Sequence, residues 1–387
     1  MSSLYDILSS KFTTMGLLDS FFKKKESSVL GIDIGSSAIK VVQLKKQGNK
    51  AILETYGELA LGPYAGVQVG QATNLPTDKV IEALTDLLKE KEVNITTRNC
   101  GIAIPFRSSL MTLIEMPTTD RKQLEQMIPI EARKYIPVPI TEVALDWTVI
   151  PRDEYEFNDA VDEEGVKPVA ATNKSDVLVI AIHNDIISNY QSIIQKAMVN
   201  ATFFEVEIFS TMRAVLDQNS TPTMILDMGA SSTKLYIVEK GIVRTSHTIN
   251  KGAQDVTATL SKSMEIPVQK AEILKREQGL IGSYEDRPLK GIMSVTLDYI
   301  FSEANRVLLS YERKTAKNIA KIILVGGGAA LKGLAAVAQE SFDTEVVAGD
   351  PFSKVQTPAF LEEVLKSTGP EFAVAVGIAI RKLQEIS

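Results

Sequence analysis

The chain has 387 residues, of which 44% are hydrophobic and 23% charged, and its formal net charge is −6. This length favours more than one hydrophobic core, and the mildly acidic balance gives no electrostatic reason to expect nucleic-acid binding. The single cysteine, Cys100, and the two histidines, His183 and His247, exclude an internal disulfide and a Cys/His zinc site. No apolar run approaches the roughly 20 residues that span a bilayer, so we expect a cytoplasmic protein without a transmembrane segment.

The first 27 residues are expected to form a leader in front of the folded part. Residues 15–25 read MGLLDSFFKKK, a short amphipathic stretch with a basic end. Its charge follows the apolar part, which argues against a signal peptide. Two interpretations remain open, a flexible leader or a segment that touches a membrane surface. Met15 is also a candidate alternative start.

Two stretches of the chain are nearly copies of each other. They read GIDIGSSAIK at residues 31–40 and LDMGASSTK at residues 226–234. Each follows an apolar run and precedes another that closes at a Gly-containing turn, which predicts strand, tight turn and strand in duplicate. We call residues 33–37 the first aspartate turn and residues 227–232 the second. The aligned pairs are Asp33 and Asp227, Gly35 and Gly229, Ser37 and Ser231, and Lys40 and Lys234.

The composition of these turns favours an anion, most naturally phosphate. Glycine permits close backbone approach, and successive N–H groups and serine hydroxyls can line a concavity. An aspartate at the strand end can hold Mg²⁺ directly or through water. A Walker A string is absent from the sequence, so this differs from a P-loop. A single turn of this composition is also common in ordinary β-hairpins, whereas two matched copies indicate a function.

Between the turns, the pattern predicts a first-lobe core at residues 28–106 and an inserted α/β subdomain at residues 107–199. The core includes a helix capped by Thr77 or Asp78 and a strand at residues 99–105, with residues 57–75 loop-like. The insertion reads as strands at residues 110–116, 143–150 and 176–183 and helices after Asp120 and at residues 184–198. Pro129 should kink or split the first of these helices. The acidic stretch at residues 153–164 is expected to be a solvated loop rather than a metal site.

Residues 200–222 should connect the first lobe to a second lobe at residues 223–387. Glu207 falls at a strand-to-helix junction there, where it could polarise an attacking water or simply complement the helix N-terminus. In the second lobe, helices are expected within residues 252–295, at residues 297–314 and, rich in small residues, at residues 373–380. A buried strand also leads into Gly326, Gly327 and Gly328, which should begin a helix. Leu331 stands where the last glycine of a dinucleotide-binding fingerprint would be, so the stretch does not match that fingerprint.

Two D-x-G turns and a late glycine triplet, in this order, resemble the actin, hexokinase and heat-shock chaperone superfamily. The resemblance implies an α/β fold of two related, ribonuclease H-like lobes that clamp ATP and Mg²⁺, with a small subdomain inserted in the first lobe. It implies that Asp33 and Asp227 hold Mg²⁺ and its waters, and that Glu207 is a tentative catalytic group. The residues implied to line the phosphates are Gly35, Ser36, Ser37, Lys40, Gly229, Ser231 and Ser232, and those near adenosine are Lys275, Gly326, Gly327 and Gly328.

Within that superfamily the chain is most similar to the type IV pilus assembly proteins of the PilM family. The similar stretches are residues 30–44, 116–139, 205–210 and 271–275. The resemblance implies a peripheral protein at the cytoplasmic face of the inner membrane, with a groove beside the inserted subdomain that receives the N-terminal cytoplasmic peptide of PilN. Whether ATP is hydrolysed stays open. The alternatives are a small-molecule kinase and an FtsA-like protein that self-associates into filaments.

Overall fold

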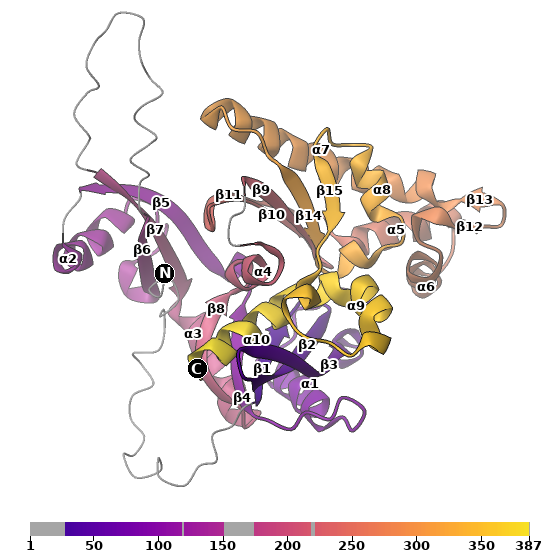
Figure 1. Ribbon diagram of the computed structural model, residues 1–387. Helices are drawn as coiled ribbons and strands as arrows, with labels where there is room; N and C mark the ends of the chain where they lie inside the picture. The colour runs from indigo at the N-terminus through magenta and orange to yellow at the C-terminus, as the bar shows by residue number, and fades with distance from the viewer. Residues whose placement is uncertain (1–27, 118–119, 151–173, 218–220, 387) are drawn as a thin grey trace, which may run out of the picture. The chain divides into compact units, whose positions relative to one another are not determined.

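Residues 28–117, 120–150, 174–217 and 221–386 are described by the computed structural model shown in Figure 1. They divide into two units, one formed by residues 105–191 and one by residues 28–104 and 192–386. The predicted leader at residues 1–27, Thr118, Thr119 and the acidic stretch at residues 153–164 lie outside the described residues.

The first lobe of the larger unit is built on a five-stranded mixed sheet. Its strand order is β3-β2-β1-β4-β8. The hairpins β1–β2 and β2–β3 are antiparallel, whereas β4 pairs parallel with β1, and β8 pairs parallel with β4. The strands are β1 (Ser28–Ile34), β2 (Ala38–Gln47), β3 (Lys50–Ala60), β4 (Asn99–Ile104) and β8 (Asn200–Val206).

The second lobe repeats this sheet strand for strand. Its order is β11-β10-β9-β14-β15, with the same two antiparallel hairpins followed by two parallel pairings. The strands are β9 (Thr223–Met228), β10 (Thr233–Glu239), β11 (Ile242–Ile249), β14 (Lys321–Val325) and β15 (Glu345–Ala348). The duplicated two-lobed fold predicted from the two aspartate turns is confirmed.

Helices supply the remaining core of each lobe. In the second lobe, the buried faces of α5, α7 and α8 pack on the sheet through residues such as Val256, Leu297 and Val337, and Figure 1 shows α7 alongside β14. The helices of the larger unit are α1 (Thr77–Lys89), α4 (Glu207–Val215), α5 (Ala253–Met264), α6 (Val268–Gln278), α7 (Leu289–Thr315), α8 (Leu334–Gln339), α9 (Glu362–Thr368) and α10 (Ala373–Glu385), with a short hairpin of β12 (Ser283–Tyr284) and β13 (Arg287–Pro288).

The last helix, α10, belongs to the first lobe. Its apolar residues share a core with Val29, Val42 and Leu44 of β1 and β2, and Figure 1 shows it running beside these strands. A Cβ on Gly31 would lie 2.0 Å from the carbonyl oxygen of Ala375, so the helix backbone rests directly on β1. The prediction that the second lobe extends over residues 223–387 is therefore wrong, because an apolar helix pattern does not say which sheet the helix covers.

A buried charge network joins α10 to the first sheet. Glu205 at the end of β8 accepts hydrogen bonds from Arg213 of α4 at 2.7 Å and from Arg381 of α10 at 3.0 Å. Ser210 donates a further one at 2.5 Å. Burial alone would raise the pKa of Glu205, but the two guanidinium groups more than offset it and lower that pKa.

The smaller unit is a three-stranded antiparallel sheet with helices. Its strand order is β5-β7-β6, formed by β5 (Ser109–Pro117), β7 (Lys174–His183) and β6 (Val143–Ile150). Helix α2 (Arg121–Ala132) begins after Asp120, whose carboxylate accepts a hydrogen bond from the Gln123 amide at 2.9 Å, as predicted. Helix α3 (Asn184–Lys196) follows β7. α2 is not split at Pro129, because its face of Leu124, Ile128 and Ala132 packs into this unit's core.

Two other local predictions are wrong. Helix α1 begins after Pro76 without a side-chain cap, since the Asp78 carboxylate pairs with Lys196 at 2.8 Å instead. β3 extends through Ala60, so the loop begins later than residue 57. The strand-to-helix junction predicted at Glu207 is confirmed, because strand β8 ends at Val206 and helix α4 begins at Glu207.

Candidate functional site

The two aspartate turns have the same backbone geometry. In the first, the Gly35 amide donates to the carbonyl oxygen of Ala38 at 3.0 Å; in the second, the Gly229 amide donates to that of Ser232 at 3.0 Å. Each glycine amide thus closes its own turn. The donors that the turns can offer to an anion are therefore the following amides and the serine hydroxyls, which are half-buried at Ser36, Ser37, Ser231 and Ser232.

The larger unit brings the two turns together. The hydroxyl oxygens of Ser36 and Ser231 lie 3.5 Å apart across 195 residues of sequence. Residues 70–73 of the first lobe strengthen this approach. The Thr73 amide and hydroxyl donate to the Ser36 carbonyl at 2.7 and 3.0 Å, and the Ala72 amide donates to the side chain of Gln254 at 3.1 Å.

Gln254 completes a continuous connection between the turns. Its own amide donates to the carbonyl oxygen of Ala230 in the second turn at 3.0 Å. Gly70, in the left-handed region at φ +88°, lies so close to Glu272 of α6 that an added Cβ would be 2.5 Å from a carboxylate oxygen. Residues 70–73 therefore tie the first turn to α5 and α6 of the second lobe.

Charged side chains gather beside the turns. Asp33 and Asp227 each lie one residue before the end of their strands, β1 and β9. Glu207 is the first residue of α4, at the strand-to-helix junction that was predicted. The Lys234 ammonium of β10 lies 2.8 Å from a Glu207 carboxylate oxygen and 2.9 Å from one of Asp227. Lys40 of β2 has looser partners, Glu58 and Glu371, both at 3.7 Å.

The electrostatics of this cluster follow from burial and like charge. Burial, followed by the Glu207 carboxylate, raises the pKa of Asp33 to about 7, although Lys40 and Lys234 oppose the shift. For Lys234, burial disfavours the ammonium, but Asp227 and Glu207 outweigh it and raise its pKa. The pKa of Lys40 is raised in the same way: burial lowers this pKa, and nearby carboxylates, Glu58 first among them, more than offset the effect of burial. Both lysines are firmly cationic.

The glycine triplet reaches this cluster from β14. Gly326, at φ +85°, packs against Asp227 so closely that a Cβ would lie 2.4 Å from its carboxylate oxygen. The Gly326 amide donates to the carbonyl oxygen of Pro370 at 2.8 Å. Gly327 is exposed, and a Cβ there would lie 3.9 Å from a carboxylate oxygen of Glu371 and 3.9 Å from the Lys40 ammonium. The triplet opens a 3-10 turn, Gly327–Ala330, rather than the predicted helix, since α8 begins at Leu334.

Lys275 is held inside the second lobe. Its ammonium contacts a Glu272 carboxylate oxygen at 2.6 Å, the Thr257 hydroxyl at 2.8 Å and the Ala253 carbonyl at 3.3 Å. The neighbouring Arg276 also pairs with Glu272 at 2.7 Å, and its side chain is 57% exposed. The Lys275 ammonium thus already has three hydrogen-bond partners within the second lobe. A direct role of Lys275 toward adenosine stays a prediction.

The donor set does not fit a metal ion bound directly by the protein. Within the described residues, no three Asp, Glu, His or Cys side chains are grouped so that they could hold one. Asp227 and Glu207 are instead bridged by the Lys234 ammonium. Contact between Asp33 or Asp227 and Mg²⁺ through water stays a prediction.

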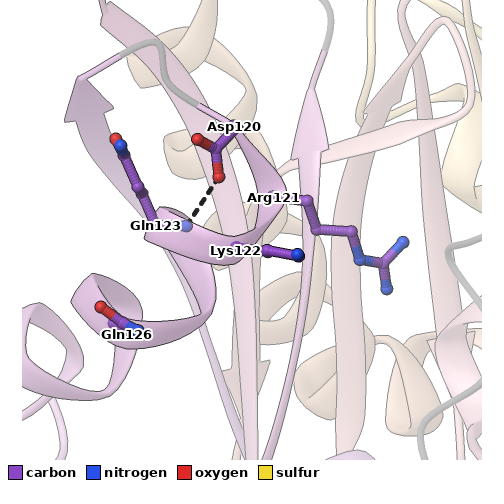
Figure 2. Close-up of a pocket in the computed structure, with 5 residues that line it drawn as sticks. All are labelled: Asp120, Arg121, Lys122, Gln123 and Gln126. Atoms are coloured by element: carbon purple, nitrogen blue, oxygen red, sulfur yellow. Dashed lines mark hydrogen bonds between the residues drawn. The ribbon is translucent and has the colours of Figure 1, made fainter.

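A depression on the smaller unit is unrelated to these residues. It has a volume of about 320 Å³ and is lined by Asp120, Arg121, Lys122, Gln123 and Gln126, all at the start of α2. Figure 2 shows the Asp120 carboxylate turned back onto the Gln123 amide, where it caps the helix. The depression contains none of the predicted site residues.

The structure brings together most of the residues predicted for the site and adds others. Sequence reasoning missed Lys234 as a site residue, although its match to Lys40 was visible in the aligned turns. It also missed Glu371, Thr73 and Gln254, for which no local motif exists, since their roles arise from contacts across long stretches of sequence.

Comparison with known proteins identifies the family. Residues 31–383 match the family model described as type IV pilus assembly protein PilM. The chain belongs to the PilM family. It is therefore an actin-like component of type IV pilus assembly, and the FtsA-like alternative is not favoured.

Individual proteins are similar to this chain in sequence or in structure over most of its length. The cell division protein FtsA of Neisseria meningitidis serogroup B is 24% identical over 379 residues, covering 90% of this PilM-family chain and 88% of that protein. A solved PilM–PilN type IV pilus biogenesis complex has a chain with a TM-score of 0.72 and 23% identity, covering 92% of this chain and 98% of that one. MreB5 of Spiroplasma citri bound to ADP has a TM-score of 0.50 and 11% identity, with 94% and 98% covered.

One further finding bears on the membrane. None of the helices in the described ranges combines the length and the apolar composition that crossing a bilayer requires.

Proposed function

We propose that this PilM-family chain binds ATP between its two aspartate turns and docks the N-terminal cytoplasmic peptide of PilN at the cytoplasmic face of the inner membrane. The observation that carries the nucleotide part is the approach of the turns, whose Ser36 and Ser231 hydroxyl oxygens lie 3.5 Å apart. Two matched anion-binding turns that face each other suit a chain of phosphates better than a single anion.

Each group in the site then has a role. The hydroxyls and amides of the two turns bind the phosphates, with Lys40 as the nearby cation. The exposed backbone at Gly327 leaves room for the nucleoside, as the ADP-bound relative of the same fold would suggest. Mg²⁺ would arrive on the triphosphate and neutralise part of its charge. Asp33 would face it through water, and Glu207 is the candidate for orienting a water molecule.

The partner is proposed from the family and the solved complex. That complex pairs a PilM with a PilN, and its similar chain covers 92% of this one. A binding groove beside residues 107–199 is the place that the family resemblance implies for the peptide. A peripheral position at the membrane follows if PilN is the anchor, because no described helix here could span a bilayer.

A titration of the purified full chain separates the two parts of this proposal. ATP is added first, and a synthetic N-terminal peptide of the cognate PilN is then titrated in the presence and absence of ATP, with a scrambled peptide as control. Binding of ATP and of the cognate peptide alone supports the proposal. A chain that binds the peptide but no nucleotide keeps the adaptor role and removes the ATP site, and equal binding of the scrambled peptide removes the docking role.

A further inference from the structure

The turn between β2 and β3 carries an excess of positive charge. Residues 45–50 read KKQGNK, with Lys45 and Lys50 exposed and Lys46 half-buried. Within the ranges that the structure describes, none of these three ammonium groups pairs with a carboxylate. The turn is also open, because a Cβ on Gly48 would meet nothing within 4 Å. This end of the hairpin is therefore a basic surface that a partner can reach.

The matching hairpin of the second lobe has no such excess. Lys45 and Glu239 each lie 12 residues after the aspartate of their own turn, so they occupy equivalent positions in the duplicated fold. Glu239 accepts a hydrogen bond from Lys317 at 2.7 Å, and its carboxylate lies 3.3 Å from Arg244. The second lobe thus has a buried carboxylate between two cations where the first lobe has an exposed lysine. The fold itself does not require the charge of the first hairpin.

The leader joins the fold beside this hairpin. Ser28, the first residue of β1, is the register partner of Lys45 in β2. Three more lysines, at residues 23–25, precede it, and Lys25 must lie within about 11 Å of Ser28, the reach of three extended residues. Residues 17–28 and 45–54 together hold six lysines and three carboxylates, a net charge of +3 in a chain whose net charge is −6. The positive charge is therefore concentrated where the leader meets β2 and β3.

The leader also supplies apolar side chains. Leu17, Leu18, Phe21 and Phe22 recur at a spacing that would place all four on one face of a helix. Apolar side chains next to a run of lysines suit the boundary of an acidic bilayer, where the former enter the acyl region and the latter meet the headgroups. An acidic protein would account for the lysines but not for the two leucines and two phenylalanines. The combination favours a lipid surface as the partner.

We propose that the β2–β3 hairpin and leader residues 17–25 form one surface that binds an anionic lipid bilayer. The hairpin lysines and residues 23–25 face the acidic headgroups, and the four apolar side chains of the leader enter the bilayer. This goes beyond the proposed function, because it gives the chain a contact with the membrane that needs neither PilN nor nucleotide.

The test is sedimentation of the purified full chain with lipid vesicles, in the absence of PilN and nucleotide. One set of vesicles contains phosphatidylcholine alone, and the other contains phosphatidylcholine mixed with phosphatidylglycerol. Each basic residue near an acidic surface strengthens binding about fivefold, so the wild-type chain should prefer the acidic vesicles by at least about tenfold. At an ionic strength of about 1 M, where the screening length falls to about 3 Å, this preference should be lost.

A lysine variant and a matched control locate the charges. Lys45→Gln, Lys46→Gln and Lys50→Gln, made together, should weaken binding to the acidic vesicles by at least about tenfold. The control removes the same charge from three exposed lysines of the second lobe and should bind as wild type; its changes are Lys240→Gln, Lys262→Gln and Lys314→Gln.

The leader is tested by Phe21→Ser made together with Phe22→Ser. This change should also weaken binding by at least about tenfold, because two aromatic side chains are lost from the apolar face that enters the bilayer. Unchanged binding in this variant or in the lysine variant would overturn the joint surface. Should the lysine variant fail to fold, the lipid and salt dependence of the wild-type chain, together with the phenylalanine variant, still decides.

The remaining outcomes separate a bilayer from other partners. Equal binding to both kinds of vesicle, or binding that resists high salt, would overturn the role of the hairpin charges. Release by soluble glycerol phosphate would indicate a free-anion site, and equal losses in the lysine variant and its control would indicate net charge alone; either overturns the proposal. A chain that binds neither vesicle overturns it as well and leaves an acidic protein as the partner. The ATP and PilN-peptide titrations use no lipid, so none of these results decides the proposed function.

Discussion

The hydroxyl oxygens of Ser36 and Ser231 lie 3.5 Å apart, although one belongs to the first aspartate turn and the other to the second. Both turns are closed by the same glycine amide hydrogen bond, and both sheets carry the same strand order. The site is therefore made by two copies of one structure that meet, and each copy supplies a lysine at the matching register position.

Asp33→Asn is expected to stabilise the chain above pH 7. In the folded state burial, Glu207 and Asp227 raise the pKa of Asp33 from 3.8 to about 7, against Lys40 and Lys234. The folded state thus binds more protons between these values, and its free energy of unfolding falls as pH rises through them. The variant lacks this loss and should gain on the order of 1–2 kcal/mol, reduced by partial exposure.

Urea unfolding at pH 4 and pH 8 measures this effect. The gain should be present at pH 8 and small at pH 4, because pH 4 lies close to the unfolded-state pKa of 3.8 and the loss of stability has only begun there. Asp298→Asn, an exposed change on α7, should have no effect at either pH. A gain that is equal at both values would contradict the assigned cause.

Gly31→Ala should prevent the close contact between β1 and α10. The new Cβ would lie 2.0 Å from the carbonyl oxygen of Ala375 and 2.7 Å from the Ala379 amide, and helix backbone cannot shift without opening the core. We expect a loss of about 3 kcal/mol or more. Gly291→Ala in α7 meets nothing within 4 Å and should stabilise by about 0.5–1 kcal/mol, so thermal unfolding of the two variants should move in opposite directions.

Glu205→Gln should destabilise strongly through the arginines that it leaves behind. Arg381 is 7% exposed and Arg213 is 13% exposed, so neither can recover full hydration. Removing one partner of a buried pair costs about 3–5 kcal/mol. Glu362→Gln breaks an exposed pair with Lys366 and should have little effect on stability, because water screens this pair. Similar losses of stability for the two variants in chemical unfolding would show that the buried Glu205 network contributes no more than an exposed ion pair.

How much of this could be read from the sequence depends on the distance between the residues involved. The hairpins and the D-x-G turns are local patterns, so the strands that follow Asp33 and Asp227 were predicted correctly, as was Glu207 at a strand-to-helix junction. The three strands of the smaller unit were also predicted, the one at residues 143–150 from its alternation. These features need only residues that are neighbours in the chain.

The failures concern long-range partners. The apolar pattern of α10 predicted a packed helix, but its placement on β1 depends on Gly31, some 340 residues earlier. The partner of Lys234 could not be read from its own hairpin alone, because one of its carboxylates, Glu207, comes from α4. Neither Glu371 nor Gln254 lies in a motif. Each belongs to the site only through a contact with a residue that is distant in sequence, Lys40 for Glu371 and Ala72 for Gln254.

Gln254→Ala should speed the release of nucleotide. This side chain accepts the Ala72 amide at 3.1 Å and thereby fixes residues 70–73, which also rest on Ser36 through Thr73. Its loss leaves one amide of the connection to water and should cost about 0.5–1.5 kcal/mol, a few-fold to tenfold in rate. Stopped-flow displacement of a fluorescent ATP analogue measures it, with the exposed Gln195→Ala as control; an unchanged release rate would show that the connection does not gate the site.

The most direct test of the shared site is an ATP titration of Ser36→Leu and Ser231→Leu. Each change puts a bulky apolar side chain into the 3.5 Å approach between the turns, while Ser302→Leu on the exposed face of α7 serves as the matched control. If the two turns form one nucleotide site, either change alone abolishes ATP binding, the pair together adds nothing, and thermal unfolding and the control stay as in wild type. Undiminished ATP affinity in either single variant would contradict the two-turn site.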